Sequence, residues 1–151
     1  EVCNAVVDGF EISFTKKSKD GSGKATISEA KSSSARVYGV VFEIAATDMP
    51  RLDRSEGRGH GYDREDEFCV VALANAASLR TWTYIANSDS VDPKLTPYDW
   101  YLDLVVAGAE QHQLPFSYIQ WLKAQPSQAD AVPTRKQRQE AVRLLRRARH
   151  V

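Results

Sequence analysis

Residues 36–62 read RVYGVVFEIAATDMPRLDRSEGRGHGY, and this stretch contains three elements in a row. Residues 36–44 are β-branched and aromatic, which predicts a central strand that is close to buried on both faces. Thr47 can cap a helix whose first turn tolerates the proline that follows. Gly57 can end this helix, and a second strand begins near Tyr62. The stretch therefore predicts a strand, a short helix and a strand.

The rest of the chain places strands first and helices later. Apolar alternation and β-branched runs predict further strands over residues 1–7, 9–16, 25–27, 62–73 and 79–86. Helical spacing begins after these strands, and helices are expected to start near Pro97, Pro115 and Pro133. Strands clustered before helices favour an α+β class over an alternating parallel α/β sheet. A length of 151 residues fits one domain, whose core needs no disulfide or metal.

Composition and charge restrict the partners that we expect. The 20 basic residues balance the 20 acidic ones, so nothing in the charge demands nucleic acid or a membrane surface. The same low net charge permits a homodimer. We find no apolar membrane span and no signal-peptide pattern, and expect a cytoplasmic location. Cys3 and Cys69 are interpreted as small buried thiols in a reducing compartment, and a single disulfide stays open as an alternative.

Three groups of segments carry a recognisable family pattern. The segments are Val37-Tyr38-Gly39-Val40-Val41-Phe42 with Leu52-Asp53-Arg54-Ser55-Glu56-Gly57 and Gly61-Tyr62; Trp82-Thr83-Tyr84-Ile85-Ala86; and Pro97-Tyr98, Gly108-Ala109 and Leu114-Pro115-Phe116-Ser117-Tyr118 with Leu122. In this order and spacing they resemble the γ-glutamyl cyclotransferase family, over roughly residues 1–126. The resemblance implies an α+β fold in which a small mixed β-barrel or sheet packs with helices. Residues 127–151 then form a linker and a basic C-terminal helix.

The family pattern opens with a segment that has no match in this sequence. The resemblance implies a strand and a loop of the form Tyr-Gly-Ser-Asn-Leu, whose backbone N–H groups hold the carboxylate of the substrate. Glu1 would align after that loop, so the domain is expected to be truncated at its N-terminus relative to the family. Either the segment was lost, or it was removed from the chain, or the gene product never had it.

The resemblance also implies an activity, namely the release of 5-oxoproline from a small-molecule γ-glutamyl amino acid or amine. The α-amine attacks the γ-carbonyl of its own glutamyl group, and the amine of the γ-amide leaves. Glu56 matches the catalytic acid/base of the family, and Gly57, Tyr62, Tyr84 and Tyr98 match its substrate-binding positions. Each tyrosine offers a hydroxyl for the substrate carboxylate and a ring that excludes water. No cofactor and no metal are expected, and the three histidines lack metal-ligand spacing.

This chemistry needs a proton shuttle, which a single carboxylate can supply. An α-ammonium group has a pKa of about 8 and a free glutamate about 4.3, so the proton transfer costs roughly 5 kcal/mol. Burial of Glu56 would raise its pKa and reduce this cost. Asp53 lies one helical turn earlier, and we expect its like charge to add to the upward shift.

Less specific interpretations stay open beside these predictions. Without the family pattern, Glu56 is a solvated carboxylate at a helix end, whereas the surrounding motif favours the catalytic position. Tyr84 also fits a core aromatic residue, and Tyr98 also fits a packing residue at a helix start. The missing loop motivates a second function, a non-catalytic member of the same fold that binds a small molecule or a protein.

The last predicted helix, over residues 133–151, is amphipathic and basic. Val142 and Leu145 form one apolar stripe, and Ala141 and Leu144 form another beside it. The favoured interpretation is a surface helix that docks its apolar face and leaves its arginines in water. An arm that binds RNA or an acidic partner is the alternative. No aromatic residues alternate with the arginines, so a nucleic-acid partner is not expected.

Overall fold

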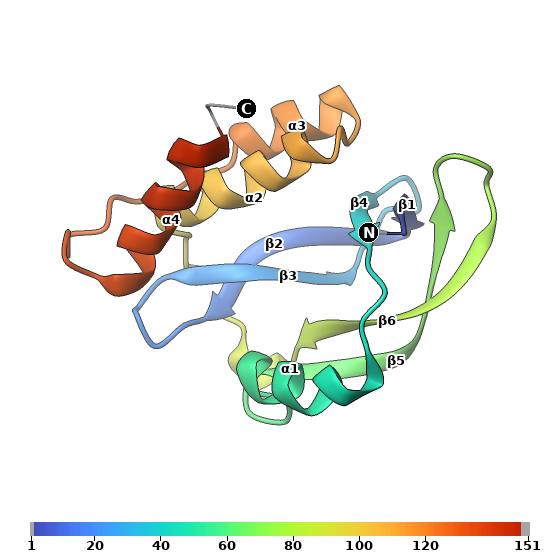
Figure 1. The fold of residues 1–151 in the computed structure, drawn as a ribbon, viewed down its shortest axis with the longest axis horizontal. Coiled ribbons are helices and arrows are strands. Elements are labelled where there is room, and N and C mark those ends of the chain that lie inside the picture. The colour runs from blue at the N-terminus through green and yellow to red at the C-terminus, as the bar shows by residue number, and fades with distance from the viewer. Residues whose placement is uncertain (1, 149–151) are drawn as a thin grey trace.

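Six strands and four α-helices lie within residues 2–148, the part of the chain that the computed structural model describes (Figure 1). The strands are β1 (Cys3–Asp8), β2 (Phe10–Lys17), β3 (Gly23–Glu29), β4 (Arg36–Val41), β5 (Tyr62–Ala72) and β6 (Ser78–Ala86). The helices are α1 (Met49–Glu56), α2 (Asp99–Gln111), α3 (Phe116–Lys123) and α4 (Lys136–Ala148), with short 3-10 helices at Ala46–Asp48 and Ser88–Ser90. The predicted α+β class is confirmed.

The strands form a curled half-barrel built from two sheets. Four strands pair in the order β4-β1-β5-β6, and β2 pairs with β3 as a separate ribbon. All pairings between these strands are antiparallel within the described residues. In Figure 1 the β2–β3 ribbon crosses the middle of the molecule, with β5, β6 and α1 on one side and the other three helices on the opposite side.

The position of β4 corrects one prediction. Its composition predicts a central strand with two buried faces, but β4 lies at the edge of the four-stranded sheet, and after the exposed Arg36 its residues are only half-buried. The strand ends at Val41, and the next residue, Phe42, is 53% exposed. The physical reason is that Val37 and Val41 line a cavity, so their apolar side chains are not enclosed in a close-packed core.

The main core lies between β2 and the helical layer of α2, α3 and α4. Its buried side chains come from β2, from α2 and α3, and from the connection between these helices: Phe14, Leu102, Val106, Ala109, Leu114, Tyr118, Ile119 and Leu122. Leu122 is only 1% exposed. This core is on the side of the ribbon away from α1, which buries no residue of its own.

The C-terminal helix α4 docks on α2, starting slightly later than predicted. Ala141 is 1% exposed and Leu145 is half-buried, whereas Leu144 is 54% and Val142 is 36% exposed. The docked face therefore takes one residue from each of the two predicted stripes. Side chains four positions apart lie on the same side of a helix, which places Ala141 and Leu145 together.

A buried carboxylate fixes the segment between α3 and α4. Asp130 accepts hydrogen bonds from the Trp100 indole N–H at 3.0 Å, the Arg135 Nε at 2.7 Å and the Val132 backbone N–H at 2.9 Å. The hydrogen bond from Arg135 is the main reason that the pKa of Asp130 lies well below its ordinary value. The predicted linker is therefore attached to the start of α2.

Both cysteines are free thiols, and neither is fully buried as predicted. Cys3 is half-buried, but Cys69 is exposed, because neighbouring residues of a strand point to opposite faces and it is Phe68 that faces inward. None of the helices within residues 2–148 combines the length and the apolar character that a membrane crossing requires.

Candidate active site

Glu56 is the last residue of α1 and directly precedes the turn that leads to β5. Gly57 adopts φ 67° and ψ 43°, a left-handed conformation that glycine reaches without a steric penalty. Its backbone N–H bonds the Arg54 and Asp53 carbonyls, so the helix ends with a glycine cap. The predicted helix end is thereby confirmed, and the cap fixes the position from which the Glu56 side chain departs.

The Glu56 side chain lines a cavity of about 770 Å³. This volume lies within the range of small-molecule sites, which are mostly apolar with a few polar groups. The walls come from α1, from β1 and β4, from β5 and β6, and from one residue of β3; they include Leu52, Val6, Val37, Val41, Phe68, Val70, Trp82, Tyr84 and Ile27. The charged residues of the lining are Glu56, Glu43 and Arg80.

The environment of Glu56 favours the neutral carboxyl group more than water does. Burial raises the pKa of Glu56 above its ordinary value, and the positive charge of Lys16 partly opposes this shift. The predicted effect of burial is therefore confirmed. The predicted contribution of Asp53 is not found, because two arginines, Arg58 at 3.0 Å and Arg64 at 2.9 Å, neutralise that carboxylate.

Asp53 instead attaches α1 to the sheet. It accepts a hydrogen bond from the Tyr84 hydroxyl at 2.5 Å and bonds from Arg58 and Arg64. The hydrogen bond from Tyr84 is the main reason that the pKa of Asp53 lies below its ordinary value, and the two arginines add to it. Asp53 precedes Glu56 by one turn of α1, so this network fixes the helix that presents Glu56 to the cavity.

Tyr84 and Tyr62 lie near Glu56, but their hydroxyl groups are already engaged. Tyr84 lines the cavity together with Glu56, and burial with the bond to Asp53 raises its pKa to about 12. The Tyr62 hydroxyl donates to the Ala25 carbonyl at 2.7 Å. Burial raises the pKa of Tyr62 far above its ordinary value, and the charge of Glu56 contributes. A phenol has one O–H, so neither group is left to donate to a substrate.

Tyr98 lies in a different part of the molecule. Its hydroxyl donates to the Asp20 carbonyl at 2.9 Å, next to the turn between β2 and β3. Its ring centroid lies 5.9 Å from the Lys24 ammonium and 5.3 Å from the Arg135 guanidinium. Tyr98 is not among the residues that line the Glu56 cavity. Of the predicted site residues, Glu56 and Tyr84 line the cavity. Gly57 follows Glu56 in the chain, and Tyr62 lies near enough for the charge of Glu56 to act on its hydroxyl, whereas Tyr98 lies at the start of α2.

Lys16 is the residue of this site that the sequence analysis does not single out. Its ammonium lies 4.8 Å from the centroid of the Tyr62 ring, and its charge acts on Glu56. The strand pattern could not have indicated it, because the pairing of β2 with β3 is irregular between Ser13 and Lys16, which interrupts the alternation after Phe14.

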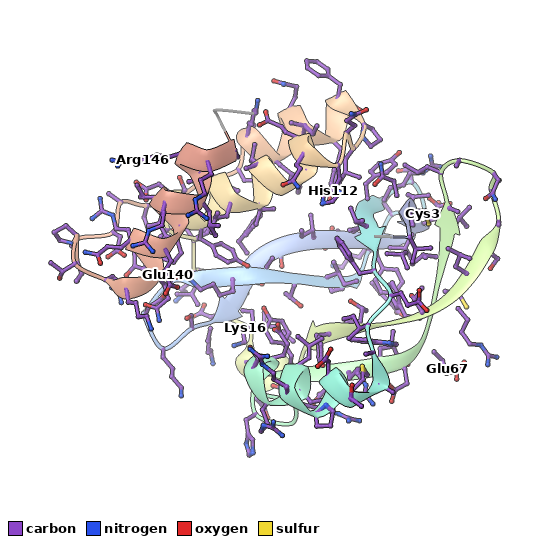
Figure 2. The ribbon with its side chains drawn as sticks, in the orientation of Figure 1. Cys3, Lys16, Glu67, His112, Glu140 and Arg146 are labelled. Carbon is purple, nitrogen blue, oxygen red and sulfur yellow. The ribbon has the colours of Figure 1, made fainter. Side chains whose placement is uncertain are left out.

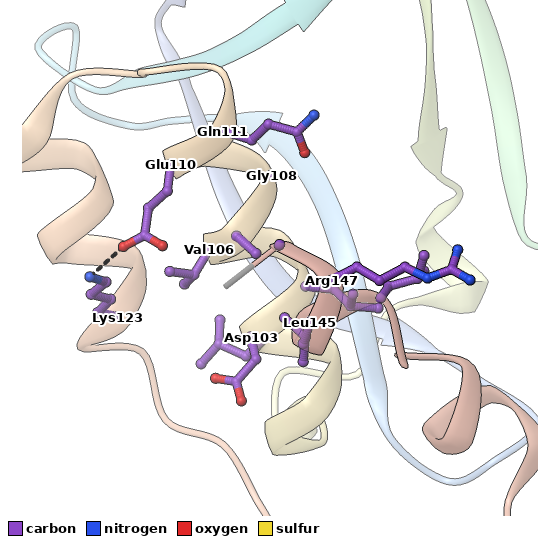
Figure 3. A pocket seen from close by; sticks show the side chains of 13 residues that line it. Asp103, Val106, Gly108, Glu110, Gln111, Lys123, Leu145 and Arg147 are labelled. Carbon is purple, nitrogen blue, oxygen red and sulfur yellow. Dashed lines mark ion pairs between the residues drawn. The ribbon is translucent and has the colours of Figure 1, made fainter. Parts of the chain in front are cut away.

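A second cavity, of about 1060 Å³, lies between α2, α3 and α4 (Figure 3). Glu110 and Lys123 point toward each other there and form an ion pair at 2.6 Å. This hollow therefore holds a neutralised pair, whereas the Glu56 cavity holds a carboxylate with a raised pKa. Within residues 2–148 no group of three or more His, Cys, Asp or Glu side chains is arranged to hold a metal ion.

Three solved structures share this fold. A γ-glutamyl cyclotransferase aligns with a TM-score of 0.80 and 21% identity, covering 94% of this chain and 83% of that chain. The uncharacterized protein loc79017 from Homo sapiens aligns with a TM-score of 0.79 and 22% identity, covering 93% and 83%. YkqA from Bacillus subtilis aligns with a TM-score of 0.66 and 19% identity, covering 83% of this chain and 45% of its own. No curated protein matches the sequence.

A sequence model of the AIG2-like family matches residues 36–122, which is more than half of the 151 residues. This match includes the strand, helix and strand that contain Glu56 and Tyr62. The structural matches are below 25% identity and establish the fold alone. The chain therefore belongs to the AIG2-like family and has a γ-glutamyl cyclotransferase-like fold.

Proposed function

We propose that this protein is a γ-glutamyl cyclotransferase-type enzyme, which converts a γ-glutamyl amino acid or amine to 5-oxoproline and the free amine. The observation that carries the proposal is the half-buried Glu56 carboxylate, which lines an apolar cavity and whose pKa is raised by burial. Perturbed carboxylates beside a cavity are frequent at catalytic sites. The fold shared with a γ-glutamyl cyclotransferase supports the same assignment.

Glu56 would act first as a base and then as an acid. Its carboxylate accepts a proton from the α-ammonium group, and the free amine attacks the γ-carbonyl carbon. A C–N bond forms and closes the five-membered lactam, while the C–N bond of the γ-amide breaks. Glu56 then returns this proton to the departing nitrogen, and the second proton that the attacking nitrogen loses on becoming the lactam N–H passes to the same departing nitrogen. The amine therefore leaves as its ammonium form, and no net proton is consumed. A raised pKa of Glu56 reduces the cost of the first transfer.

The cavity would supply positioning and the exclusion of water. A γ-glutamyl chain must curl for its amine to meet its own carbonyl, and holding such a geometry contributes about 7–11 kcal/mol in the best intramolecular cases. Leu52 and Trp82 provide apolar walls beside Glu56. Because most of the lining is apolar, a substrate whose leaving amine carries an apolar side chain fits better than one with a charged side chain.

The first test is the substitution Glu56→Gln, which preserves shape and removes the base. We expect the release of 5-oxoproline from γ-glutamyl-leucine, measured by chromatography, to fall by roughly 10²- to 10⁴-fold. Glu43→Gln is the matched control, because Glu43 is an exposed carboxylate of the same cavity lining. Wild-type turnover by a folded Glu56→Gln variant would exclude the proposed role.

The pH dependence of kcat/KM is the second test. The base must be ionised, so activity rises as Glu56 loses its proton. Because burial raises the pKa of Glu56 above its ordinary value, the acidic limb is expected at a higher pH than for a solvated glutamate. An acidic limb at the ordinary pKa of a solvated glutamate, about 4.3, measured where the protein stays folded, would mean that a solvated carboxylate acts instead.

A non-catalytic, ligand-binding member of the same fold is the second candidate function. It is favoured by the tyrosine hydroxyls, because those of Tyr62, Tyr84 and Tyr98 donate to protein acceptors. Thermal shifts with γ-glutamyl dipeptides in the absence of any lactam release would support this candidate over the enzyme.

A further inference from the structure

The hollow between α2, α3 and α4 is a groove with an apolar floor. Leu102 and Val106 of α2 lie in this floor, and Leu144 and Leu145 of α4 form one side. The α2 residues that line the groove extend from Leu102 to Gln111, which is nine steps of about 1.5 Å and gives a length of about 14 Å. A helix of two to three turns can therefore lie along the groove between α3 and α4.

The two sides of the groove differ in charge. Figure 3 shows Glu110 and Lys123 on one side and Leu145 and Arg147 on the other, with Val106 between them. Glu110 neutralises Lys123, so the α3 side carries no net charge. Arg147 has no acidic partner among residues 2–148, so the α4 side is positive.

Three arginines lie close together at the end of α4. Arg143, Arg146 and Arg147 are exposed, and none of them forms an ion pair within the described part of the chain. Residues three and four positions apart are neighbours on a helix, where like charges disfavour the helical state. Attraction to the negative end of the helix dipole offsets part of this repulsion. Figure 2 shows Arg146 on the outer side of α4, away from α2, where a partner can reach it.

The start of α4 and the segment before it are different. Arg135 forms an ion pair with Asp130 at 2.7 Å, and the Lys136 ammonium lies 4.0 Å from the Glu140 carboxylate. Both of these cations thus have an acidic partner in the chain. The arginine cluster instead surrounds Leu144, which lines the groove and is 54% exposed. An exposed apolar side chain beside unpaired cations is typical of a surface that binds an acidic partner.

We propose that the groove between α2, α3 and α4 binds an acidic amphipathic helix of a partner protein. The apolar face of that helix would cover Val106 and Leu144, and acidic residues at its border would pair with Arg143 and Arg147. Asp103, an exposed acid of the lining, would face a neutral or basic position of the partner. The groove is separate from the proposed active site, because the helical layer and α1 lie on opposite sides of the β2–β3 ribbon.

Charge and shape favour this occupant over two others. A second copy of the chain, docked through the same surface about a two-fold axis, would bring the two arginine clusters together. A nucleic acid would contact the arginines through its phosphates but would leave the apolar floor uncovered.

Two synthetic peptides labelled with fluorescein test the proposal. One is an amphipathic helix of leucine and glutamate, and the other has lysine in place of every glutamate. We expect fluorescence anisotropy at low salt to show that the acidic peptide binds the full chain roughly ten-fold or more tightly than the basic peptide. Added salt should weaken this binding, because the arginines are exposed and their charges are screened.

The apolar contact is tested by a matched pair of substitutions in α4. Leu144→Ser should weaken binding of the acidic peptide roughly 5- to 10-fold, because the half-exposed leucine loses the contact that docking would complete. Val142→Ser is the control, because Val142 is 36% exposed but does not line the groove. Thermal melting establishes that each variant is folded.

The charges are tested by a second pair of variants. Arg143→Gln combined with Arg147→Gln should weaken binding of the acidic peptide roughly 3- to 30-fold, the range for two exposed ion pairs. Arg51→Gln combined with Arg54→Gln makes the same change in net charge on α1 and should have no effect. Asp103→Asn should strengthen binding, because it removes a like charge from the lining.

Other results would overturn the proposal. It fails if the acidic peptide does not bind, if the basic peptide binds equally well, or if the Leu144 and double-arginine variants bind like the parent chain. Light scattering that shows a dimer, lost in Leu144→Ser, would assign the groove to a second copy. Binding to phosphatidylserine vesicles that is lost in the same variant would assign it to a membrane surface.

Discussion

The helical layer and the α1 region are held in place by different interactions. Helix α2 alone buries Trp100, Leu102, Val106 and Ala109, and Leu122 of α3 is 1% exposed. Helix α1 buries none of its residues. It is attached instead by one carboxylate, that of Asp53, which accepts bonds from β5, β6 and the turn after the helix.

The comparison indicates that the region that stabilises the fold is not the region that orients the proposed base, Glu56. Apolar burial supplies most folding free energy but is not directional. Hydrogen bonds to an ionised group add little net stability in partly exposed positions, but they fix geometry. The helix that carries Glu56 is thus oriented by polar contacts, and the molecule is stabilised elsewhere. Regions with few buried apolar contacts open locally at low free-energy cost, so α1 is expected to open before the core does.

The largest effect on stability is expected from Leu122→Ala in the helical layer. Removing a fully buried leucine side chain lowers the free energy of unfolding by about 2–5 kcal/mol. Urea unfolding at neutral pH measures the change. Because this core is on the opposite side of the β2–β3 ribbon from α1, the activity per folded molecule should be retained.

Leu144→Ala is the matched control, since it makes the same chemical change at a leucine that is 54% exposed. We expect its effect to stay within about 0.5 kcal/mol. Similar losses in both variants, or a loss of activity in folded Leu122→Ala, would show that the two regions are not independent.

The next effect is on activity and arises in the α1 region. Tyr84 lines the same cavity as Glu56, and its hydroxyl donates a hydrogen bond to Asp53. The substitution Tyr84→Phe removes this hydroxyl. Small displacements of a catalytic group are costly, and we expect kcat/KM to fall roughly 10- to 100-fold. Urea unfolding should change much less than in Leu122→Ala. Hydrogen exchange should show faster opening of α1 amides, and unchanged exchange there would contradict the network's role.

Much of this arrangement could be predicted from sequence, because the informative signals are local. The order of strands and helices follows from apolar periodicity, and the end of α1 follows from Gly57, which adopts the left-handed conformation that a glycine cap requires. The position of Glu56 at the exit of that helix follows from the same motif. These features depend on residues that are neighbours in the chain.

The partners of the tyrosines could not be predicted, because they come from distant parts of the chain. Tyr62 donates to Ala25, 37 positions away, and Tyr98 to Asp20, 78 positions away. The edge position of β4 likewise depends on which strands pair, and composition alone does not determine pairing. The sequence shows where each tyrosine lies in the chain. Only the fold determines which acceptor its hydroxyl group donates a hydrogen bond to.

The smallest predicted effect concerns Asp20, which lies where the β2–β3 turn meets the start of α2. Burial raises the pKa of its carboxyl, but hydrogen bonds from the Ser22 hydroxyl and backbone N–H and from Lys24 outweigh burial and lower the pKa to about 2, from 3.8. The stabilisation is present above pH 3.8 and is lost as the pH falls toward 2.

Asp20→Asn removes this contribution and tests whether charge matters on the helical side as well. The full shift would correspond to roughly 2.4 kcal/mol, which solvent screening reduces to about 1 kcal/mol. Urea unfolding should show wild type more stable by that amount at pH 7, and the difference should fall to a small fraction of this at pH 2. Asp8→Asn is the control, because the Asp8 carboxylate is 59% exposed and its bond to Arg36 is screened. A difference as large at pH 2 as at pH 7 would assign the stabilisation to packing, and the helical side would then be held by apolar contacts alone.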